Sequence, residues 1–274
     1  MIPLHLDIAL VQADLLAWFD RFVDGYRQPD GSLSAMAELK YRHTHLVTAN
    51  AVAIAALEPW PESWRCCAWA AGLLHDVGRF PQLKQFKSFN DAITVNHAEC
   101  SHNHIVAGGA LDAWPADWRS AVLTAVRHHN ARHVPEGLPE FDLAMLQVVR
   151  DADKLDIYRV FQNAILTGQV GKNPEMILGA NLSNIPNANA LGHLRDRTQM
   201  AYSELTTLGD FLIMQLVWMH DLNCRGAFRL ILEREILDFI ASQLPAGDRE
   251  IDELIAVTRE HVEAKANGKL KVDS

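Results

Sequence analysis

The stretch CAWAAGLLHDVGRF, residues 67–80, decides the fold of this chain. Its apolar part is typical of a buried helix, because Ala68, Ala71 and His75 are spaced three and four residues apart and share one face. His75 and Asp76 stand side by side where this helix ends. A carboxylate next to a buried stripe needs a partner, and a divalent metal is one such partner. The stretch therefore predicts a helical core that carries a polar site.

Helical periodicity continues on both sides of this stretch, whereas the alternating pattern of a strand is scarce. We therefore expect an all-α protein built as a helical bundle. Residues 168–190 are rich in Gly, Asn and Pro, which is typical of an irregular connection. The expected organisation is a metal-binding helical domain over residues 1–170, followed by a linker and a helical extension over 171–274 that packs on it. Helices are predicted at about 7–26, 34–58, 62–77, 97–111, 116–129, 140–166 and 249–267, and the pattern is also helical over about 191–243.

Two further polar side chains are predicted on buried helix faces. In the helix from residue 34, His43 shares a face with Leu46 and Asn50, whereas His45 lies about 200° around the helix. In LQVVRDADKLD, residues 146–156, Asp153 falls on the apolar stripe and is expected to be a buried carboxylate. Taken alone, a core His that is satisfied by hydrogen bonds, or an Asp paired with a distant Arg, would explain either position.

Two more groups of histidines lie between these positions. His97 opens a helix in NHAECSHNHIV, residues 96–106, and the pair His128 and His129 closes one in AVRHHNARH, residues 125–133. Each group is weak evidence alone. Together the chain presents His, His-Asp, His, His-His and Asp on separate helices, which favours a metal site over ordinary core packing.

The segments HTHLV, LLHDVGRF, NHAE, VRHHN and DADKLD resemble the motifs of the HD-domain superfamily of metal-dependent phosphohydrolases, over about residues 39–160. The resemblance implies one or two divalent transition metals (Fe, Mn, Ni, Co or Zn), with Asp76 bridging the two. It also implies the choice of His128 over His129, since both fit the helix end. The implied metal ligands are His43, His75, Asp76, His97, His128 and Asp153.

The resemblance further implies that a metal-activated hydroxide hydrolyses a small phosphomonoester, a nucleotide or a phosphodiester. Besides Asp76 itself, candidates for phosphate contact or proton transfer are Arg79, Lys154, His129 and His133. A structural ion pair is the alternative for Arg79 and Lys154, and a solvated loop residue is the alternative for His133. The GYP tripeptide of the cyclic-di-GMP branch is missing, which favours a small phosphomonoester or nucleotide.

Two other functions fit the same residues. An HD-like di-iron oxygenase uses a related set of six His and Asp ligands, and iron content with oxygen consumption would identify it. A signalling or binding module with a non-catalytic HD site is the other alternative, although the ligand set is complete here.

The bulk composition excludes some classes of partner. The net charge of −9 disfavours non-specific binding to nucleic acid. The apolar run of residues 66–74 is far too short to span a membrane, and the start of the chain lacks the basic residues of a signal peptide. Four cysteines without a CxxC pair indicate free thiols, so we expect a cytoplasmic protein. Apolar surface on the 171–274 helices would allow a homodimer.

Overall fold

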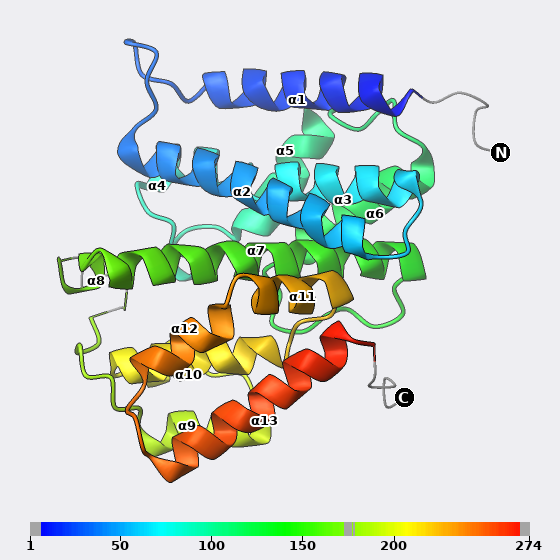
Figure 1. The fold of residues 1–274 in the computed structure, drawn as a ribbon. Helices are drawn as coiled ribbons and strands as arrows, with labels where there is room; N and C mark the ends of the chain where they lie inside the picture. The colour runs from blue at the N-terminus through cyan, green and yellow to red at the C-terminus, as the bar shows by residue number, and fades with distance from the viewer. Residues whose placement is uncertain (1–6, 173–176, 178, 269–274) are drawn as a thin grey trace. The chain divides into compact units, whose positions relative to one another are not determined.

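The chain is helical, as its periodicity predicts, and the computed structural model describes residues 7–172, 177 and 179–268. No β-strand occurs among these residues. The chain divides into two compact units, residues 1–153 and residues 154–274, and the boundary falls inside helix α7 (Glu140–Leu166) (Figure 1). This boundary does not coincide with the predicted division at residue 170. In the described part of the chain, no helix combines the length and the apolar character that a membrane crossing requires.

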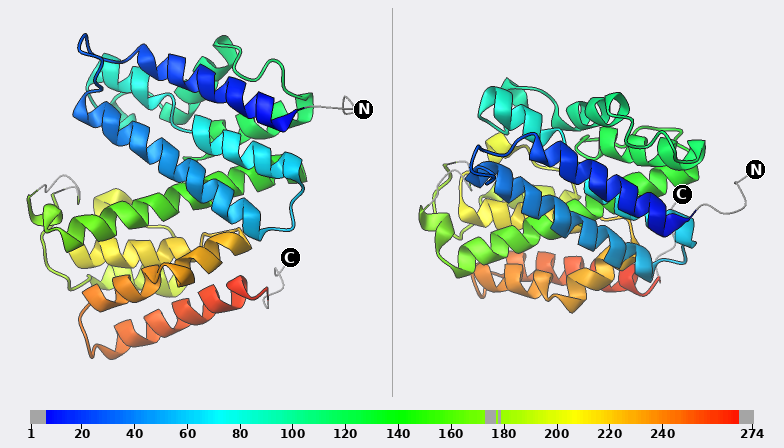
Figure 2. Two further views of the ribbon diagram at one scale, coloured as in Figure 1. Left: turned by 45° about the horizontal axis from the view of Figure 1, so that its top comes forward. Right: turned by 90° about the horizontal axis from the view of Figure 1, so that it is seen from above.

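In the N-terminal unit, α3 forms the centre of the core. All its residues from Cys66 to Leu74 are buried except Trp69. It packs along α2 and also contacts α1 and α6, and α5 contacts α4 and α6 (Figures 1 and 2). The helices of this unit are α1 (Ile8–Asp24), α2 (Ala35–Leu57), α3 (Glu62–Leu74), α4 (Arg79–Phe86), α5 (His97–Ala107), α6 (Ala116–His128) and the first part of α7, with a short 3-10 turn, η1 (Asp91–Ile93).

Side-chain caps fix where several helices begin. Asp7 accepts a hydrogen bond from the Leu10 amide at the start of α1, at 3.2 Å. Asn96 accepts hydrogen bonds from the Ala98 and Glu99 amides, at 2.9 and 3.3 Å, at the start of α5. Such caps satisfy amides that have no partner inside the helix. The Asn96 cap makes the next residue, His97, the first residue of α5.

Gly78 allows the turn after α3 to pack tightly against α5. Its amide donates a hydrogen bond to the Ser101 hydroxyl at 2.8 Å. A Cβ atom at residue 78 would lie 2.4 Å from the His97 carbonyl oxygen and 2.5 Å from the Ser101 amide nitrogen. Both neighbours are backbone atoms of α5, so neither can move without moving the helix. The His75–Gly78 turn and the start of α5 are therefore held at a separation that only glycine permits.

We expect Gly78→Ala to lower the free energy of unfolding by about 1–3 kcal/mol, because the added methyl group forces α5 away from the turn. Thermal unfolding followed by circular dichroism would measure this loss. Gly192→Ala is the matched control, because a Cβ at that position in α9 meets no atom within 4 Å. The control should be neutral or slightly stabilising. Equal midpoints for the two variants would contradict the role given to Gly78.

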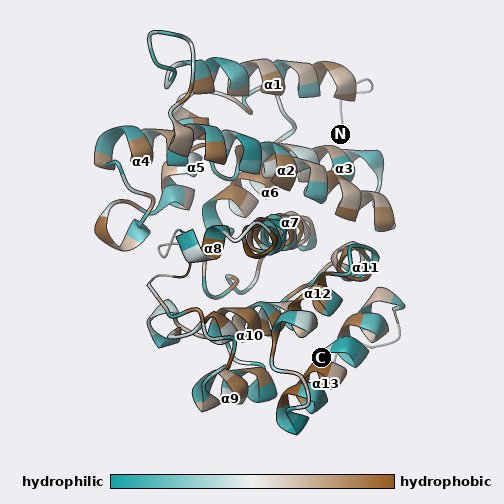
Figure 3. Cartoon of the chain, turned by 60° about the vertical axis from the view of Figure 1, so that its left-hand side comes forward, coloured by the Kyte–Doolittle hydropathy of each residue, from teal (hydrophilic) through white to brown (hydrophobic). Residues whose placement is uncertain are grey.

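In the C-terminal unit, α10 is the buried centre. Ten of its twelve residues are buried, and the hydropathy colouring shows it as mostly apolar (Figure 3). The Tyr158 hydroxyl on α7 donates a hydrogen bond to the Gln215 carbonyl at 3.0 Å. Besides the end of α7, this unit contains α8 (Gln169–Lys172), α9 (Ala188–Asp196), the 3-10 turn η3 (Tyr202–Glu204), α10 (Leu208–Met219), α11 (Arg225–Glu233), α12 (Ile236–Gln243) and α13 (Arg249–Ala266).

The connection predicted over 168–190 is largely irregular where it is described. It contains the short helix α8 and one isolated parallel bridge between Asn181 and Thr207. Residues 173–176 and 178 lie outside the described residues.

Two histidines face each other between α10 and α13. The rings of His220 and His261 have centroids 4.6 Å apart, and the His220 Nε2 lies 3.2 Å from the Thr258 hydroxyl. Burial lowers the pKa of each imidazole to about 4; the other ring and Arg197 add to the shift at His220, and Arg197 and Lys265 add to it at His261. Both rings are therefore neutral at neutral pH.

This pair makes the stability of the C-terminal unit depend on pH. An imidazole in the unfolded chain has a pKa near 6.5, so the unfolded state binds more protons between about pH 6.5 and pH 4. The contribution of the pair is fully present above that range and is lost as pH falls through it. His220→Gln and His261→Gln should each flatten the fall of the melting midpoint between pH 7 and pH 4.5. A fall as steep as in the unchanged protein would contradict this.

Candidate metal centre

Six His and Asp side chains from five segments of the N-terminal unit meet in one cluster. Their burial is high: His75 is 0%, Asp76 2%, His97 5% and His129 6% exposed. The side chains of His43 and Asp153 are more open, at 12% and 26%. The cluster consists of His43 on α2, His75 and Asp76 in the turn after α3, His97 at the start of α5, His129 just after α6, and Asp153 on α7.

One half of the cluster surrounds the Oδ2 atom of Asp76. The Nε2 atoms of His43 and His75 each lie 3.7 Å from this oxygen. The Oδ1 of Asp153 lies 3.1 Å from the His43 Nε2. One ligand atom each of His43, His75 and Asp153 lies within 4.8 Å of the others, so the three could hold a metal ion.

The other half surrounds the Oδ1 atom of the same carboxylate. His97 Nε2 lies 3.4 Å and His129 Nε2 lies 3.9 Å from this oxygen. The two Nε2 atoms lie 3.0 Å from each other. His75, Asp76 and His129 also form a group that could hold a metal ion. Asp76 therefore presents one oxygen to each of two groups of imidazole nitrogens.

The second nitrogen of three imidazoles is held by a hydrogen bond. His75 Nδ1 donates to the Gly72 carbonyl and His129 Nδ1 donates to the Val126 carbonyl, each at 2.8 Å. His97 Nδ1 lies 2.5 Å from the Oδ2 of Asp91. A hydrogen bond at Nδ1 leaves Nε2 as the free lone pair and fixes the ring, which is the arrangement of metal-binding histidines.

Two polar atoms in the middle of the cluster have no hydrogen-bond partner among the described residues. They are the Nε2 of His75 and the Oδ1 of Asp76, both buried from solvent. An unsatisfied buried polar atom costs free energy, and here two such atoms belong to adjacent residues of one cluster. Imidazole nitrogen and carboxylate oxygen are together suited to divalent transition metals. The residues therefore fit a metal ion by both their unsatisfied atoms and their chemistry.

The pKa shifts of three cluster residues favour the protonation states that bind a metal ion. Burial alone would raise the pKa of Asp76, but Lys40, His75, His97 and Arg79 bring it well below its usual range. Burial would also raise the pKa of Asp153, but the hydrogen bond and the charge of His43 lower it. Burial lowers the pKa of His129 to about 3. The cluster thus offers ionised carboxylates and a neutral His129 imidazole at neutral pH, which are the forms that bind metals.

The structure selects His129, and not His128, as the histidine at the end of α6 that joins the cluster. His128 is the last residue of α6, is only partly buried and has no cluster atom among its described partners. His129 follows it, and the αR backbone turns its ring inward. The resemblance had indicated His128 as the ligand, and the helix end alone did not distinguish the two. The structure therefore places His129 in the cluster, and which of the two histidines binds a metal stays a prediction.

Other predicted residues have different surroundings. Lys154 donates to the Oδ2 of Asp221 at 2.6 Å and to the Asp221 carbonyl at 3.0 Å. It therefore forms the structural ion pair that was the alternative to a phosphate contact. Arg79 Nη1 lies 2.9 Å from the Oδ1 of Asp91, and its Nε lies 3.4 Å from the Oδ1 of Asp76. His133 is exposed in the loop after α6, so its predicted substrate contact stays a prediction.

The relative burial of the α7 carboxylates was not as predicted. Asp153 was expected to be the buried one, but its side chain is 26% exposed, whereas Asp151 and Asp156 are 0% and 1% exposed. The apolar stripe alone could not show this, because α7 is buried on more than one of its faces. Asp153 still reaches the cluster through its contact with His43.

The site also contains residues that no sequence pattern indicated. Asp91 binds the ring of His97, the guanidinium of Arg79 and the amide of Gln82. It lies in the non-periodic stretch 79–96, where helical phase gives no information. Lys40 donates to the Oδ2 of Asp76 at 2.9 Å. Its spacing of three residues before His43 places it on the same side of α2, but a surface lysine can have the same spacing.

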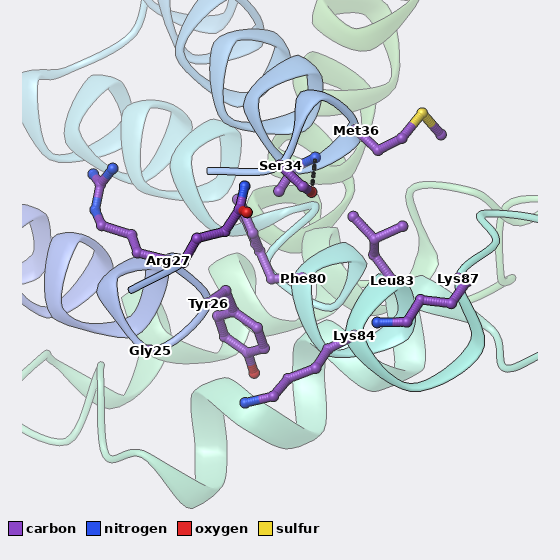
Figure 4. A pocket seen from close by; sticks show the side chains of 11 residues that line it. Gly25, Tyr26, Arg27, Ser34, Met36, Phe80, Leu83, Lys84 and Lys87 are labelled. Atoms are coloured by element: carbon purple, nitrogen blue, oxygen red, sulfur yellow. Dashed lines mark hydrogen bonds between the residues drawn. The ribbon is translucent and has the colours of Figure 1, made fainter. Parts of the chain in front are cut away.

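A separate cavity of about 500 Å³ lies between the end of α1, the start of α2 and α4 (Figure 4). Lys84 extends beside the ring of Tyr26, with its Nζ 5.3 Å from the ring centroid. None of the six cluster residues lines this cavity.

The fold and the cluster define the class of this protein as an all-α protein with a buried His and Asp centre suited to divalent metals. Residues 41–158 match the HD domain family, which confirms the resemblance seen over about residues 39–160. The chain thus carries an HD domain, and this domain contains all six residues of the cluster. No match was found among curated proteins or among solved structures.

The neighbouring histidines allow a matched test of the cluster. His129→Gln should lower the amount of bound metal, because it removes an Nε2 that faces Asp76. His128→Gln changes the same residue type one position earlier and should leave the metal content unchanged. Metal analysis of the two purified variants by mass spectrometry measures the difference. Loss of metal from the His128 variant alone would restore the original assignment.

Proposed function

We propose that this chain is a metal-dependent phosphohydrolase that acts on a small phosphomonoester, a nucleotide or a phosphodiester. The observation that supports this most is the carboxylate of Asp76, which faces two groups of imidazole nitrogens with its two oxygens. A single carboxylate in that position suits a pair of divalent cations. The HD domain match supports the same reaction class.

The chain's own residues divide into two groups of ligands. His43, His75 and Asp153 would hold one metal ion together with Asp76, and His97 and His129 would help Asp76 to hold a second. When bound, such ions lower the pKa of a water molecule and neutralise charge on phosphate oxygens.

Residues around the ligands orient them and balance charge. Asp91 holds the ring of His97 from the Nδ1 side, and Arg79 holds Asp91. The same Arg79 and Lys40 place two positive charges next to Asp76. Positive charge at the edge of the cluster attracts an anionic substrate into a protein whose net charge is −9.

We also infer that the protein works in a reducing compartment such as the cytoplasm. Its four cysteines are free, and Cys66, Cys67 and Cys224 are buried. Burial raises the pKa of Cys66 to about 12, so this thiol is inert.

The decisive experiment combines metal analysis with a substrate screen. The purified protein should contain about one or two divalent metal ions per chain and should hydrolyse at least one of a panel of phosphomonoesters, nucleotides and cyclic dinucleotides. Asp76→Ala should lose both the metal and the activity, because it removes the oxygens that both ligand groups share. Asp14→Ala, an exposed position on α1, is the control that should lose neither.

Two outcomes would contradict the proposal. Unchanged metal content and turnover in the Asp76 variant would exclude the cluster as the active site. Bound iron with oxygen consumption and no phosphate release would favour a di-iron oxygenase, since the same four histidines and two aspartates also suit iron.

A further inference from the structure

Lys40 is a cation at the centre of the site that is not a possible metal ligand in its charged form. It lies on α2, three residues before His43, and its side chain is 18% exposed. Its Nζ donates to the Oδ2 of Asp76 at 2.9 Å, which is the oxygen that also faces His43 and His75. Any molecule held at that oxygen by a metal ion would therefore lie within reach of this ammonium.

The position of Lys40 is unfavourable for metal binding by itself. A positive charge next to the shared carboxylate repels a divalent cation, and the repulsion is stronger where water is excluded. Asp76 is 2% exposed, so this repulsion is poorly screened. Without a metal ion, the ion pair with Asp76 accounts for Lys40. Once a metal ion binds the same carboxylate the repulsion remains, and an anion bound at the same place would offset it.

Arg79, the other cation beside Asp76, is held in place much more firmly. Its Nη1 lies within 2.9 Å of three oxygens, from Gln82, the Phe89 carbonyl and Asp91. These contacts use the guanidinium to fix the loop that carries Asp91. Arg79 therefore has little freedom to follow a substrate.

Lys40 has fewer contacts and a flexible stem. In the described part of the chain its ammonium has one ion-pair partner, Asp76, and lies 5.6 Å from the centroid of the Phe89 ring. The ring also contacts the guanidinium of Arg79 at the same distance. Four rotatable methylene groups let a lysine move its charge by several ångström without moving the helix.

We propose that Lys40 is a substrate-binding residue that contacts an anionic oxygen of the phosphate group, whereas Arg79 is a positioning residue for Asp91 and His97. This inference rests on the proposed phosphohydrolase function and assigns the anion contact within it. It replaces the contact expected from Lys154, whose ammonium is bound by Asp221. The ligand class is a compact oxyanion such as a terminal phosphate.

The experiment measures binding of inorganic phosphate to the full-length protein loaded with metal, by isothermal titration calorimetry. Lys40→Met should raise the dissociation constant for phosphate at least about tenfold, because a hydrogen bond between two charged groups is lost. Metal content should be unchanged, and metal affinity unchanged or higher, because a repelling charge is removed. Lys40→Arg should restore part of the phosphate affinity.

Lys84→Met is the matched control. It removes the same charge from the same unit, but Lys84 is exposed on α4 and lies beside Tyr26 in the separate cavity (Figure 4). Phosphate affinity should stay as in the unchanged protein. An equal loss in both variants would mean that only long-range charge matters, which would overturn the assignment of a contact.

The remaining outcomes separate this inference from the proposed function. Unchanged phosphate affinity in the Lys40→Met variant, or loss of its metal, would overturn the role of Lys40 while hydrolysis by the unchanged protein would still support the function. Phosphate binding that depends on Lys40, without hydrolysis of any phosphate ester, would overturn the function and leave the anion contact. Absence of phosphate binding to the unchanged protein would overturn the inference.

Discussion

The buried carboxylate of Asp76 is the constraint on which the N-terminal unit depends. Its two oxygens face two different groups of nitrogen atoms, and one of these oxygens has no hydrogen-bond partner in the part of the chain that the structure describes. Such an arrangement is costly unless several helices hold it in place. The groups around this carboxylate are held by the tight contact at Gly78 and by the helix cap at Asn96. They are also held by the hydrogen bonds of His75 and His129 to backbone carbonyls.

The surroundings of Asp76 keep the imidazoles of His75 and His129 neutral while the carboxylate of Asp76 stays ionised. Burial lowers the pKa of His75 and His129, and nearby positive groups lower the pKa of Asp76 against the effect of its own burial. Asp91, although outside the ligand set, extends this pattern by binding His97 and Arg79 together. A neutral His129 and an ionised Asp76 are the forms in which these side chains bind a cation.

A second His-Asp dipeptide shows how little such a pair means without its surroundings. His220 and Asp221 follow α10 in the C-terminal unit. There the tilted rings of His220 and His261 pack together, and Asp221 binds the ammonium of Lys154. Among the described residues, neither His220 nor Asp221 belongs to a group of side chains that could hold a metal ion. The dipeptide serves packing and an ion pair in one unit and forms the centre of a polar cluster in the other.

The sequence by itself determined the helical class, the HD segment and most of the cluster. His43 was separated from His45 by helical phase, and the structure agrees: His45 packs against Phe19 and Tyr41. His75, Asp76 and His97 could be found because each stands at a helix end or on a stripe that periodicity locates.

Only the tertiary structure decided the rest. It placed His129, and not His128, in the cluster. The sequence could not show this, because two adjacent residues at a helix end differ only in how the chain turns after the helix. It brought Asp91 and Lys40 to the site, since Asp91 lies in a non-periodic loop and Lys40 cannot be told from a surface lysine until its partner is known. Periodicity reports which face of a helix is buried, whereas the identity of the atoms across that face depends on contacts between distant segments.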